Sequence, residues 1–318
     1  MRTLEMKAVS GVSRWMSVMI CLAGWSTADF AVAQESGLAF LTIGIDAAAI
    51  ARSDASTAST RGAYATFWNP AGLAIAGRNE VALSHHRWID GIRTYSIAAR
   101  FSAGKTSGVG LFITGTDSGP LEARDQPGPP TGTFEAQFLT VGGSYAFTFG
   151  PVRVGATVKY ITERIYTDSA RGYGIDAGLH ASFLNNGFHA GAVIQNIGEM
   201  SELRTRATDL PKTFRFGTQF FPFRIINGMD GSTLVNISIS ADVSHNLIDE
   251  NTRFHFGGDG RVLDVLIIRL GYMTNDELRG FSTGLGLEIS DINFDYALVP
   301  FKEGFDGPAH VISLRYGY

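Results

Sequence analysis

The sequence predicts an all-β fold, a transmembrane antiparallel β-barrel of about 14 strands with a short helical or irregular plug at its N-terminus. Three observations predict it. Segments throughout the chain alternate apolar residues with small or polar ones at a period of two, and an export signal precedes them. Although 45% of the residues are hydrophobic and the mean hydropathy is +0.07, no segment after the signal has 18 consecutive apolar residues. Membrane-spanning helices are therefore excluded.

The first 33 residues have the composition of a cleaved signal peptide. Arg2, Lys7 and Arg14 precede an apolar run over 15–25, and the small residues at 31–33 form a cleavage site. A membrane-spanning helix needs about 20 apolar residues, and this run is shorter. We expect a mature chain that begins at Gln34 and lies in the outer membrane of a Gram-negative-type bacterium, in contact with membrane lipid and lipopolysaccharide.

The charge and cysteine content exclude several classes of function. The formal net charge is −4, and the signal peptide carries three basic and two acidic residues, so the mature chain is slightly more acidic. Nucleic acid is therefore a poor partner. The single cysteine, Cys21, lies in the signal peptide. We therefore expect no disulfide, no cysteine metal site and no cofactor in the mature protein.

The last predicted strand shows the alternation clearly. One face carries Val311, Ser313, Arg315 and Gly317; the other carries Ile312, Leu314, Tyr316 and Tyr318. Lipid on one side and a lumen on the other produce such a pattern, with aromatic residues near the membrane interface. We expect Tyr316 and Tyr318 to form a C-terminal assembly signal. The same alternation recurs over 152–160, 233–244 and 281–290.

The whole barrel domain, 78–318, divides into about fourteen such segments. Strands are predicted at 79–89, 93–102, 107–116, 134–147, 152–164, 173–184, 188–196, 212–221, 233–244, 252–258, 264–273, 280–290, 292–300 and 309–318. Short connections alternate with longer ones such as 117–133, 165–172 and 197–211, as expected for periplasmic turns and external loops. The segment 222–232 is an exception, because it is long where a short turn is expected. A soluble β-sandwich or propeller would show the same alternation, but the strand lengths and the aromatic terminus favour a membrane barrel.

The plug segment, 34–77, has a different composition and ends in a distinctive box. It is rich in alanine, serine and threonine, and the box consists of Trp68, Asn69, Pro70, Ala71, Gly72, Leu73 and Ala74. Pro70 disfavours helical geometry at Asn69, and Gly72 permits a tight turn. Trp68 and Leu73 can then pack inside the barrel mouth. We interpret the box as structural and not catalytic.

This segment resembles the N-terminus of the PorV/PorQ family of outer-membrane proteins, which are relatives of the FadL long-chain fatty-acid transporters. The resemblance rests on residues 40–47, of the pattern Phe-Leu-x-Ile-Gly-x-Asp-Ala, and on the Trp-Asn-Pro-Ala-Gly-Leu-Ala box at 68–74. FadL relatives also carry Asn-Pro-Ala, so the box indicates the superfamily better than the subfamily. The family usually has an arginine after the first alanine and a Met-Gly pair further along. This chain has Ala48 and Ala51-Arg52 there.

No motif in the chain predicts catalysis. Gly104-Lys105-Thr106 lacks the first glycine of a phosphate-binding loop and precedes a strand, so it is interpreted as a hairpin turn. His85 and His86 are neighbours on a strand and face opposite sides, with one toward the lumen, which makes joint metal coordination unfavourable. Neither Gly-x-Ser-x-Gly nor His-Glu-x-x-His occurs. We expect a protein that is not an enzyme.

Two functions remain open. The resemblance to PorV implies a component of type IX secretion, which would bind C-terminal signal domains of secreted proteins and other secretion-system components. External loops would supply the contacts, with Arg204, Arg206 and Lys212 as candidates. The alternative is FadL-like transport of hydrophobic small molecules past the plug or through a lateral gap. The polar lumen-facing residues and the modest length favour protein handling.

Overall fold

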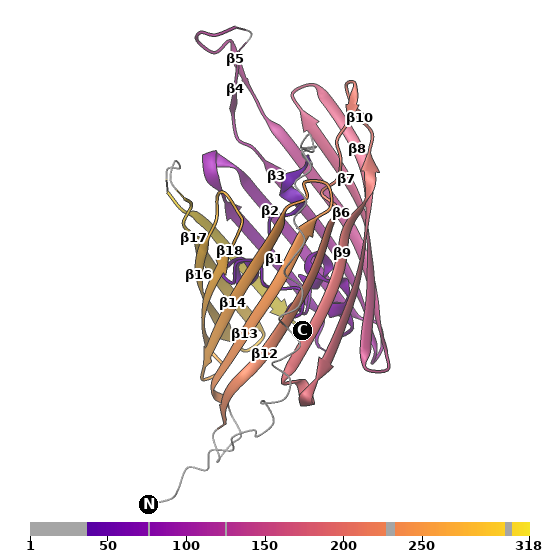
Figure 1. Ribbon diagram of the computed structural model, residues 1–318, viewed down its shortest axis with the longest axis vertical. Coiled ribbons are helices and arrows are strands. Elements are labelled where there is room, and N and C mark those ends of the chain that lie inside the picture. The colour runs from indigo at the N-terminus through magenta and orange to yellow at the C-terminus, as the bar shows by residue number, and fades with distance from the viewer. Residues whose placement is uncertain (1–36, 76, 125, 227–232, 303–306) are drawn as a thin grey trace, which may run out of the picture. The chain divides into compact units, whose positions relative to one another are not determined.

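The computed structural model describes residues 37–75, 77–124, 126–226, 233–302 and 307–318, without the side chains of residues 226 and 233. The predicted signal peptide lies outside this part of the chain. Fourteen antiparallel strands form a closed barrel, so the predicted fold class is confirmed. Each strand pairs with its sequence neighbour in the barrel, and β1 pairs with β18 to close the ring (Figure 1). Closure satisfies the backbone polar groups that lipid cannot.

The barrel strands match the predicted segments closely. They are β1 (Glu80–Arg87), β2 (Arg93–Ser102), β3 (Ser107–Asp117), β6 (Ala136–Phe149), β7 (Val152–Ile165), β8 (Asp168–Phe183), β9 (Phe188–Met200), β12 (Thr213–Ile226), β13 (Thr233–Asn246), β14 (Thr252–Val262), β15 (Leu266–Met273), β16 (Phe281–Ile289), β17 (Ile292–Val299) and β18 (Ala309–Gly317). Two small hairpins extend from the connections, β4–β5 (Leu121–Ala123, Gly132–Phe134) and β10–β11 (Glu202–Leu203, Arg206–Ala207). Both belong to the end with the longer connections, here called the long-loop end. The opposite end is called the short-turn end.

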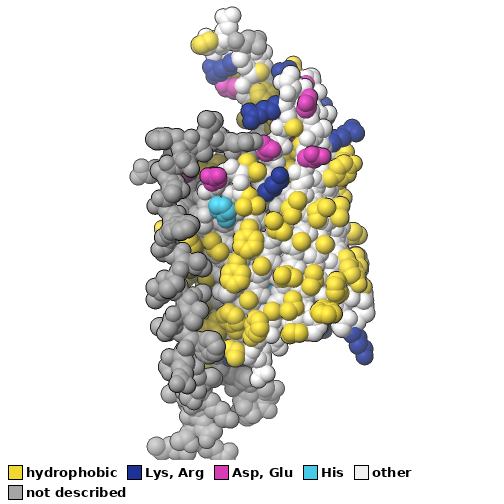
Figure 2. Space-filling model, turned by 45° about the vertical axis from the view of Figure 1, so that its right-hand side comes forward, with side chains coloured by type: hydrophobic (Ala, Val, Ile, Leu, Met, Phe, Trp, Pro, Cys, Tyr) yellow, Lys and Arg dark blue, Asp and Glu magenta, His cyan; other side chains and the backbone are white. Residues whose placement is uncertain are grey.

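The predicted alternation separates an exposed, apolar outer face of the barrel from a buried inner face. On β18, Ile312, Leu314 and Tyr316 are exposed on the outside, whereas Val311 and Ser313 are buried inside. Large apolar side chains exposed on the other strands join them in a belt around the barrel, with charged residues concentrated beyond it (Figure 2). A surface of this kind is stable only against lipid. Among the described residues, no helix is long and apolar enough to cross a bilayer.

The N-terminal segment, residues 37–75, lies inside the barrel. It contains four short helices, η2 (Ala39–Leu41), α1 (Ala47–Ile50), α2 (Ala65–Trp68) and η3 (Pro70–Ala74). The helix η3 contacts β3, β6, β7 and β8, and α1 contacts β16, β17 and β18 on the other side of the lumen (Figure 1). Two further helices of the described residues, η4 (Ile89–Gly91) and η5 (Leu184–Asn186), lie in connections of the barrel.

Three predicted loops were partly wrong. The loop predicted at 165–172 is a tight turn at Tyr166 and Thr167, because β8 begins at Asp168 and pairs with β7 from there. Likewise β9 continues to Met200, into the loop predicted at 197–211. The loop predicted at 222–232 begins too early, because β12 continues to Ile226. The pairing of β12 with β13 shifts between Phe220 and Phe223, and such a bulge accommodates Pro222, which has no N–H for the sheet.

Candidate functional site

The Trp-Asn-Pro box is deeply buried in the lumen. Trp68 and Asn69 are each 1% exposed, and Pro70, Ala71, Gly72 and Leu73 are also buried. The indole Nε1–H of Trp68 donates to Asp46 Oδ1 over 2.7 Å, and the other oxygen of Asp46 accepts from the N–H of Ala49. Asp46 thus joins the box to α1, whose N-terminus it caps. The two halves of the predicted family motif meet at this carboxylate.

Asn69 fastens the box to the barrel wall. Its side-chain amide donates to the carbonyl of Thr57 at 3.0 Å and to that of Leu179, on β8, at 2.9 Å. Its side-chain oxygen accepts from the N–H of Ala71 at 3.2 Å and so caps η3. Pro70 follows at the first helical position, where a missing N–H costs nothing. The sequence therefore fixes the start of η3, and the barrel supplies the acceptor on β8.

Glycines in the wall make room for the box. A side chain at Gly155 on β7 would collide with the backbone of Pro70 and Ala71, and one at Gly178 on β8 would collide with Asn69 Oδ1. The backbone of the box can therefore approach the strands closely. From the sequence alone, these glycines could be explained only by a general expectation that side chains crowd in a lumen.

Buried ion pairs line the wall opposite the box. Arg52 pairs with Asp259 at 3.1 Å, Asp259 with Arg269 at 3.1 Å, Arg269 with Asp295 at 2.7 Å, and Asp295 with Arg315 at 3.3 Å. This chain of charges ties the N-terminal segment to strands β14, β15, β17 and β18. The polar lumen predicted from the alternation is present, and its charges are largely paired.

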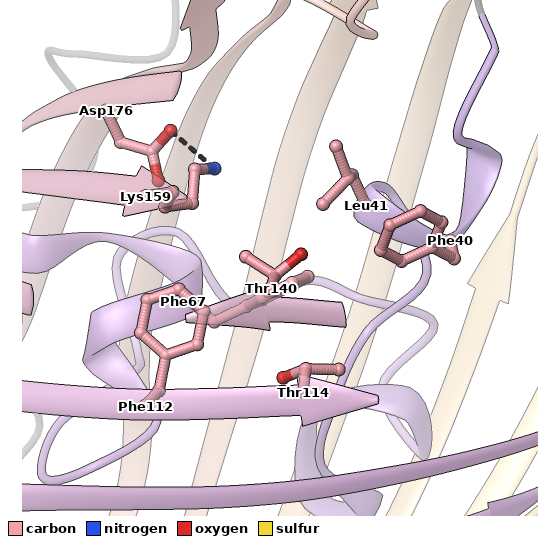
Figure 3. A pocket seen from close by; sticks show the side chains of 8 residues that line it. All are labelled: Phe40, Leu41, Phe67, Phe112, Thr114, Thr140, Lys159 and Asp176. Carbon is pink, nitrogen blue, oxygen red and sulfur yellow. Dashed lines mark ion pairs between the residues drawn. The ribbon is translucent and has the colours of Figure 1, made fainter. Parts of the chain in front are cut away.

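A small apolar pocket lies on the long-loop side of the box (Figure 3). It is lined by Phe40, Leu41, Phe67, Phe112, Thr114, Thr140, Lys159 and Asp176. Its volume is about 10 Å³, which holds about one water molecule. The Phe40 ring packs 4.7 Å from that of Phe138. Leu38, Phe40 and Leu41 also belong to an apolar cluster with Ile161, Ala170, Met200 and Leu210.

A buried ion pair forms the polar edge of this pocket. Lys159 Nζ lies 2.8 Å from Asp176 Oδ1, and both side chains are almost fully buried. Lys159 also donates to the side chain of Asn196. Asn196 has a φ of 61° where the pairing of β8 with β9 shifts by one residue, and its side-chain amide donates to the carbonyl of Pro211. The pair therefore anchors a bulge in the wall and the end of the loop over 201–212. Neither the position of Asn196 nor this pairing could be predicted from the sequence.

A larger, polar cavity lies on the short-turn side. Its volume is about 400 Å³, and its lining includes residues near the short-turn ends of β12 to β15, such as Arg224, Arg261 and Asp264. From the N-terminal segment, Arg52, Arg61 and Tyr64 face it. The cavity is therefore lined mainly by charged and polar side chains, unlike the pocket on the other side of the box.

A tether joins the long-loop end to the N-terminal segment. In the connection between β15 and β16, Arg279 pairs with Asp54 at 2.8 Å and lies over the ring of Trp88 at 5.8 Å. Arg279 also faces Asp276 at 3.6 Å. Burial by itself raises the pKa of Asp276, but Arg279, Arg253 and the N–H groups of Leu278 and Arg279 together lower it below its usual range. This connection is thus ordered by charge.

The remaining predicted site residues lie apart from these cavities. Arg204 is exposed and pairs with Asp168 at 2.6 Å, and Arg206 is exposed in β11. The carbonyl of Lys212 accepts from the N–H of Leu247 at 2.8 Å. Tyr316 and Tyr318 stack on the outer surface with ring centroids 6.1 Å apart. Their roles as loop contacts and as an assembly signal stay predictions. His85 stacks on Tyr95 whereas His86 is buried, so the two face opposite sides as predicted.

The fold is a closed 14-strand barrel with a filled lumen, and solved structures of other proteins have a similar fold. The toluene transporter TbuX of Ralstonia pickettii aligns over 86% of this chain and 98% of its own, with a TM-score of 0.60 and 14% identity. The P. putida toluene transporter TodX aligns over 86% and 99%, with a TM-score of 0.56 and 10% identity. A mutant of TodX described as a monoaromatic hydrocarbon channel scores 0.55 at 12% identity, again over 86% and 99%.

These likenesses establish the fold. The predicted resemblance to the PorV/PorQ family and to its FadL relatives stays a prediction. No protein-family model matches the chain, and no curated protein matches it. The alignments span nearly the whole of the two transporters, so the length of this chain does not argue against transport.

Proposed function

We propose that this chain is an outer-membrane channel for hydrophobic small molecules and is not an enzyme. The observation that carries the proposal is the pocket on the long-loop side of the box, whose Phe40 and Leu41 also belong to an apolar cluster with Met200 and Leu210. Apolar side chains at the outer end of a barrel provide a first binding site for a molecule that water excludes. The shared fold with TbuX and TodX supports the same function. The comparisons offer no support for the secretion function implied by the resemblance to PorV.

The pocket must enlarge before it can bind. Its volume of about 10 Å³ is far below the roughly 300 Å³ and above typical of ligand sites. Phe40 and Leu41 lie in the three-residue helix η2, which is joined to α1 by a connection without regular structure over 42–46. We infer that η2 moves away from Phe67 and Phe112 when a ligand enters, while the hydrogen-bonded box stays in place. Movement of a short helix costs less than movement of a buried, hydrogen-bonded box.

Uptake of labelled toluene tests the proposal. Cells without a hydrocarbon channel of their own would be given the full-length chain, and we expect uptake several times faster than in cells with an empty vector. Phe40→Asp should return uptake to the background, because a charge in the pocket repels an apolar ligand. Leu184→Asp is the matched control, since Leu184 is 76% exposed in a short turn. Heat-modified mobility on gels would show that each variant forms a folded barrel.

Two results would overturn the proposal. One is uptake at the background rate with the unmodified, folded chain. The other is equal uptake through the Phe40→Asp and unmodified chains, because the route would then bypass the pocket. A pull-down from native membranes distinguishes the secretion function. Secreted proteins that share a C-terminal β-domain would support that function, and extracted hydrophobic molecules without such proteins would support transport.

A further inference from the structure

Two arginines at the short-turn end are held by histidines and a serine. Arg153, on β7, donates to His180 Nδ1 at 3.2 Å and to Ser182 Oγ at 3.0 Å. Arg61, in the N-terminal segment, donates to His189 Nε2 at 2.9 Å. The other ring nitrogen of His189 lies 2.9 Å from the same Ser182 Oγ. The two guanidinium groups thus belong to one hydrogen-bonded cluster.

The hydrogen bonds require both histidines to be neutral. A guanidinium can only donate, so His180 Nδ1 and His189 Nε2 must each accept with a lone pair. The remaining nitrogens then carry the single protons, and His180 Nε2–H donates to the carbonyl of Ala58 at 3.0 Å. The cluster therefore carries two positive charges from Arg61 and Arg153. In the part of the chain that the structure describes, no carboxylate lies within ion-pair distance of either arginine.

Three other arginines of the lumen differ in this respect. Arg261, which also lines the short-turn cavity, pairs with Glu288, while Arg52 and Arg269 both pair with Asp259. Arg61 is exposed to the same cavity without such a partner. A cation that has donors directed into a cavity and no carboxylate at hand is a site for an anion from solution.

We propose that the short-turn cavity binds a small oxyanion, a carboxylate or a phosphate, through the guanidinium of Arg61. Arg153, which bonds to His180 and Ser182, adds a second positive charge to the cluster. The cavity, of about 400 Å³, is large enough for such an anion with several waters. Two-pronged donation suits arginine for the planar edge of a carboxylate or phosphate. The proposal is independent of hydrocarbon transport, which concerns the opposite side of the box.

Equilibrium dialysis of the detergent-solubilised full-length chain tests the site, with radiolabelled inorganic phosphate in one arm and acetate in another, at low ionic strength. We expect saturable binding of one anion per barrel in at least one arm, and the arm that binds more tightly identifies the anion class. Arg61→Gln should weaken binding about tenfold or more, and Arg153→Gln by a smaller factor. Arg61→Lys should retain more affinity than Arg61→Gln. Arg204→Gln removes an arginine at the long-loop end and should leave binding unchanged.

The proposal fails if neither anion binds saturably, or if Arg61→Gln binds as well as the unmodified chain. A purely structural cluster would give one of these results while the variant loses heat resistance. If Arg61→Gln does not fold, Arg153→Gln and Arg61→Lys decide the question through their affinities. Toluene uptake should be the same in Arg61→Gln as in the unmodified chain, so failure here is distinguishable from failure of the proposed transport.

Discussion

The two cavities on either side of the box differ in volume and in chemistry. The pocket on the long-loop side is apolar and holds about 10 Å³, whereas the cavity on the short-turn side is lined by charges and holds about 400 Å³. Apolar side chains close an empty space because each unfilled void loses dispersion contacts. Charged side chains keep water, because their desolvation is costly. The two sides of the box therefore differ in what they hold, since the long-loop side closes on apolar side chains and the short-turn side has room for water.

The box lies between the two cavities and is held in place by hydrogen bonds. Its bonds to Asp46, Thr57 and Leu179 are buried and directional, so it cannot shift without leaving polar groups unpaired. We therefore expect the largest effects from changes at the box and the smallest from changes in the connection between β15 and β16.

The largest effect is expected from Gly178→Leu. The new side chain would occupy the space of Asn69 Oδ1, and we expect a loss of about 3 kcal/mol in barrel stability because the box would be displaced. Displacement would also join the two cavities, so the variant should show raised ion conductance in planar bilayers. Stability would be followed by the temperature at which the folded band is lost on gels.

Gly143→Leu is the matched control for this variant. Gly143 faces outward on β6, where an added side chain meets only Leu111 at ordinary contact distance. Unchanged conductance and stability in Gly178→Leu would mean that the box does not separate the cavities.

A smaller effect is expected from Asn69→Ala. Loss of the cap on η3 and of the bonds to Thr57 and Leu179 should cost about 2–3 kcal/mol. The box would loosen without being forced out, so conductance should rise less than in Gly178→Leu. Gln137→Ala, which removes an exposed side-chain amide on β6, should change neither stability nor conductance. An Asn69→Ala barrel as heat resistant as the unmodified one would contradict the anchoring role.

The smallest effect is expected at the tether of the long-loop end. The pKa of Asp276 is lower in the folded protein than its usual value, so its stabilising contribution is present above about pH 4 and is lost as the pH falls further. Hydrogen exchange of residues 274–280, measured by mass spectrometry, should therefore quicken on acidification. Asp276→Asn should lose about 1–2 kcal/mol of local protection at neutral pH and most of the acid response. An acid response equal to that of the unmodified chain would show that other groups hold this connection.

Much of the barrel could be predicted from local pattern. The fourteen segments with period two lie where the structure has strands, because lipid on one side and a lumen on the other impose the same requirement on every strand. The predicted strand ends were wrong where the alternating pattern stops but the hydrogen-bonded pairing of the strands continues. Before Tyr173 the outward face of β8 carries Ser169 and Arg171 in place of apolar residues, and Pro222 interrupts β12. Long neighbouring strands nevertheless supply the hydrogen bonds that extend both.

The candidate sites also depend partly on local sequence and partly on contacts between distant segments. The start of η3 in the box follows from local sequence, because the side-chain cap of Asn69 and the ring of Pro70 act on near neighbours. Local sequence also determined the outward belt, which depends only on alternation. Only the folded chain brings Asp46 to Trp68, Lys159 to Asp176, and Arg61 to Arg153 through His189 and Ser182. These contacts depend on the register of strands and on the path of the N-terminal segment across the lumen, neither of which is encoded by any residue's neighbours in sequence.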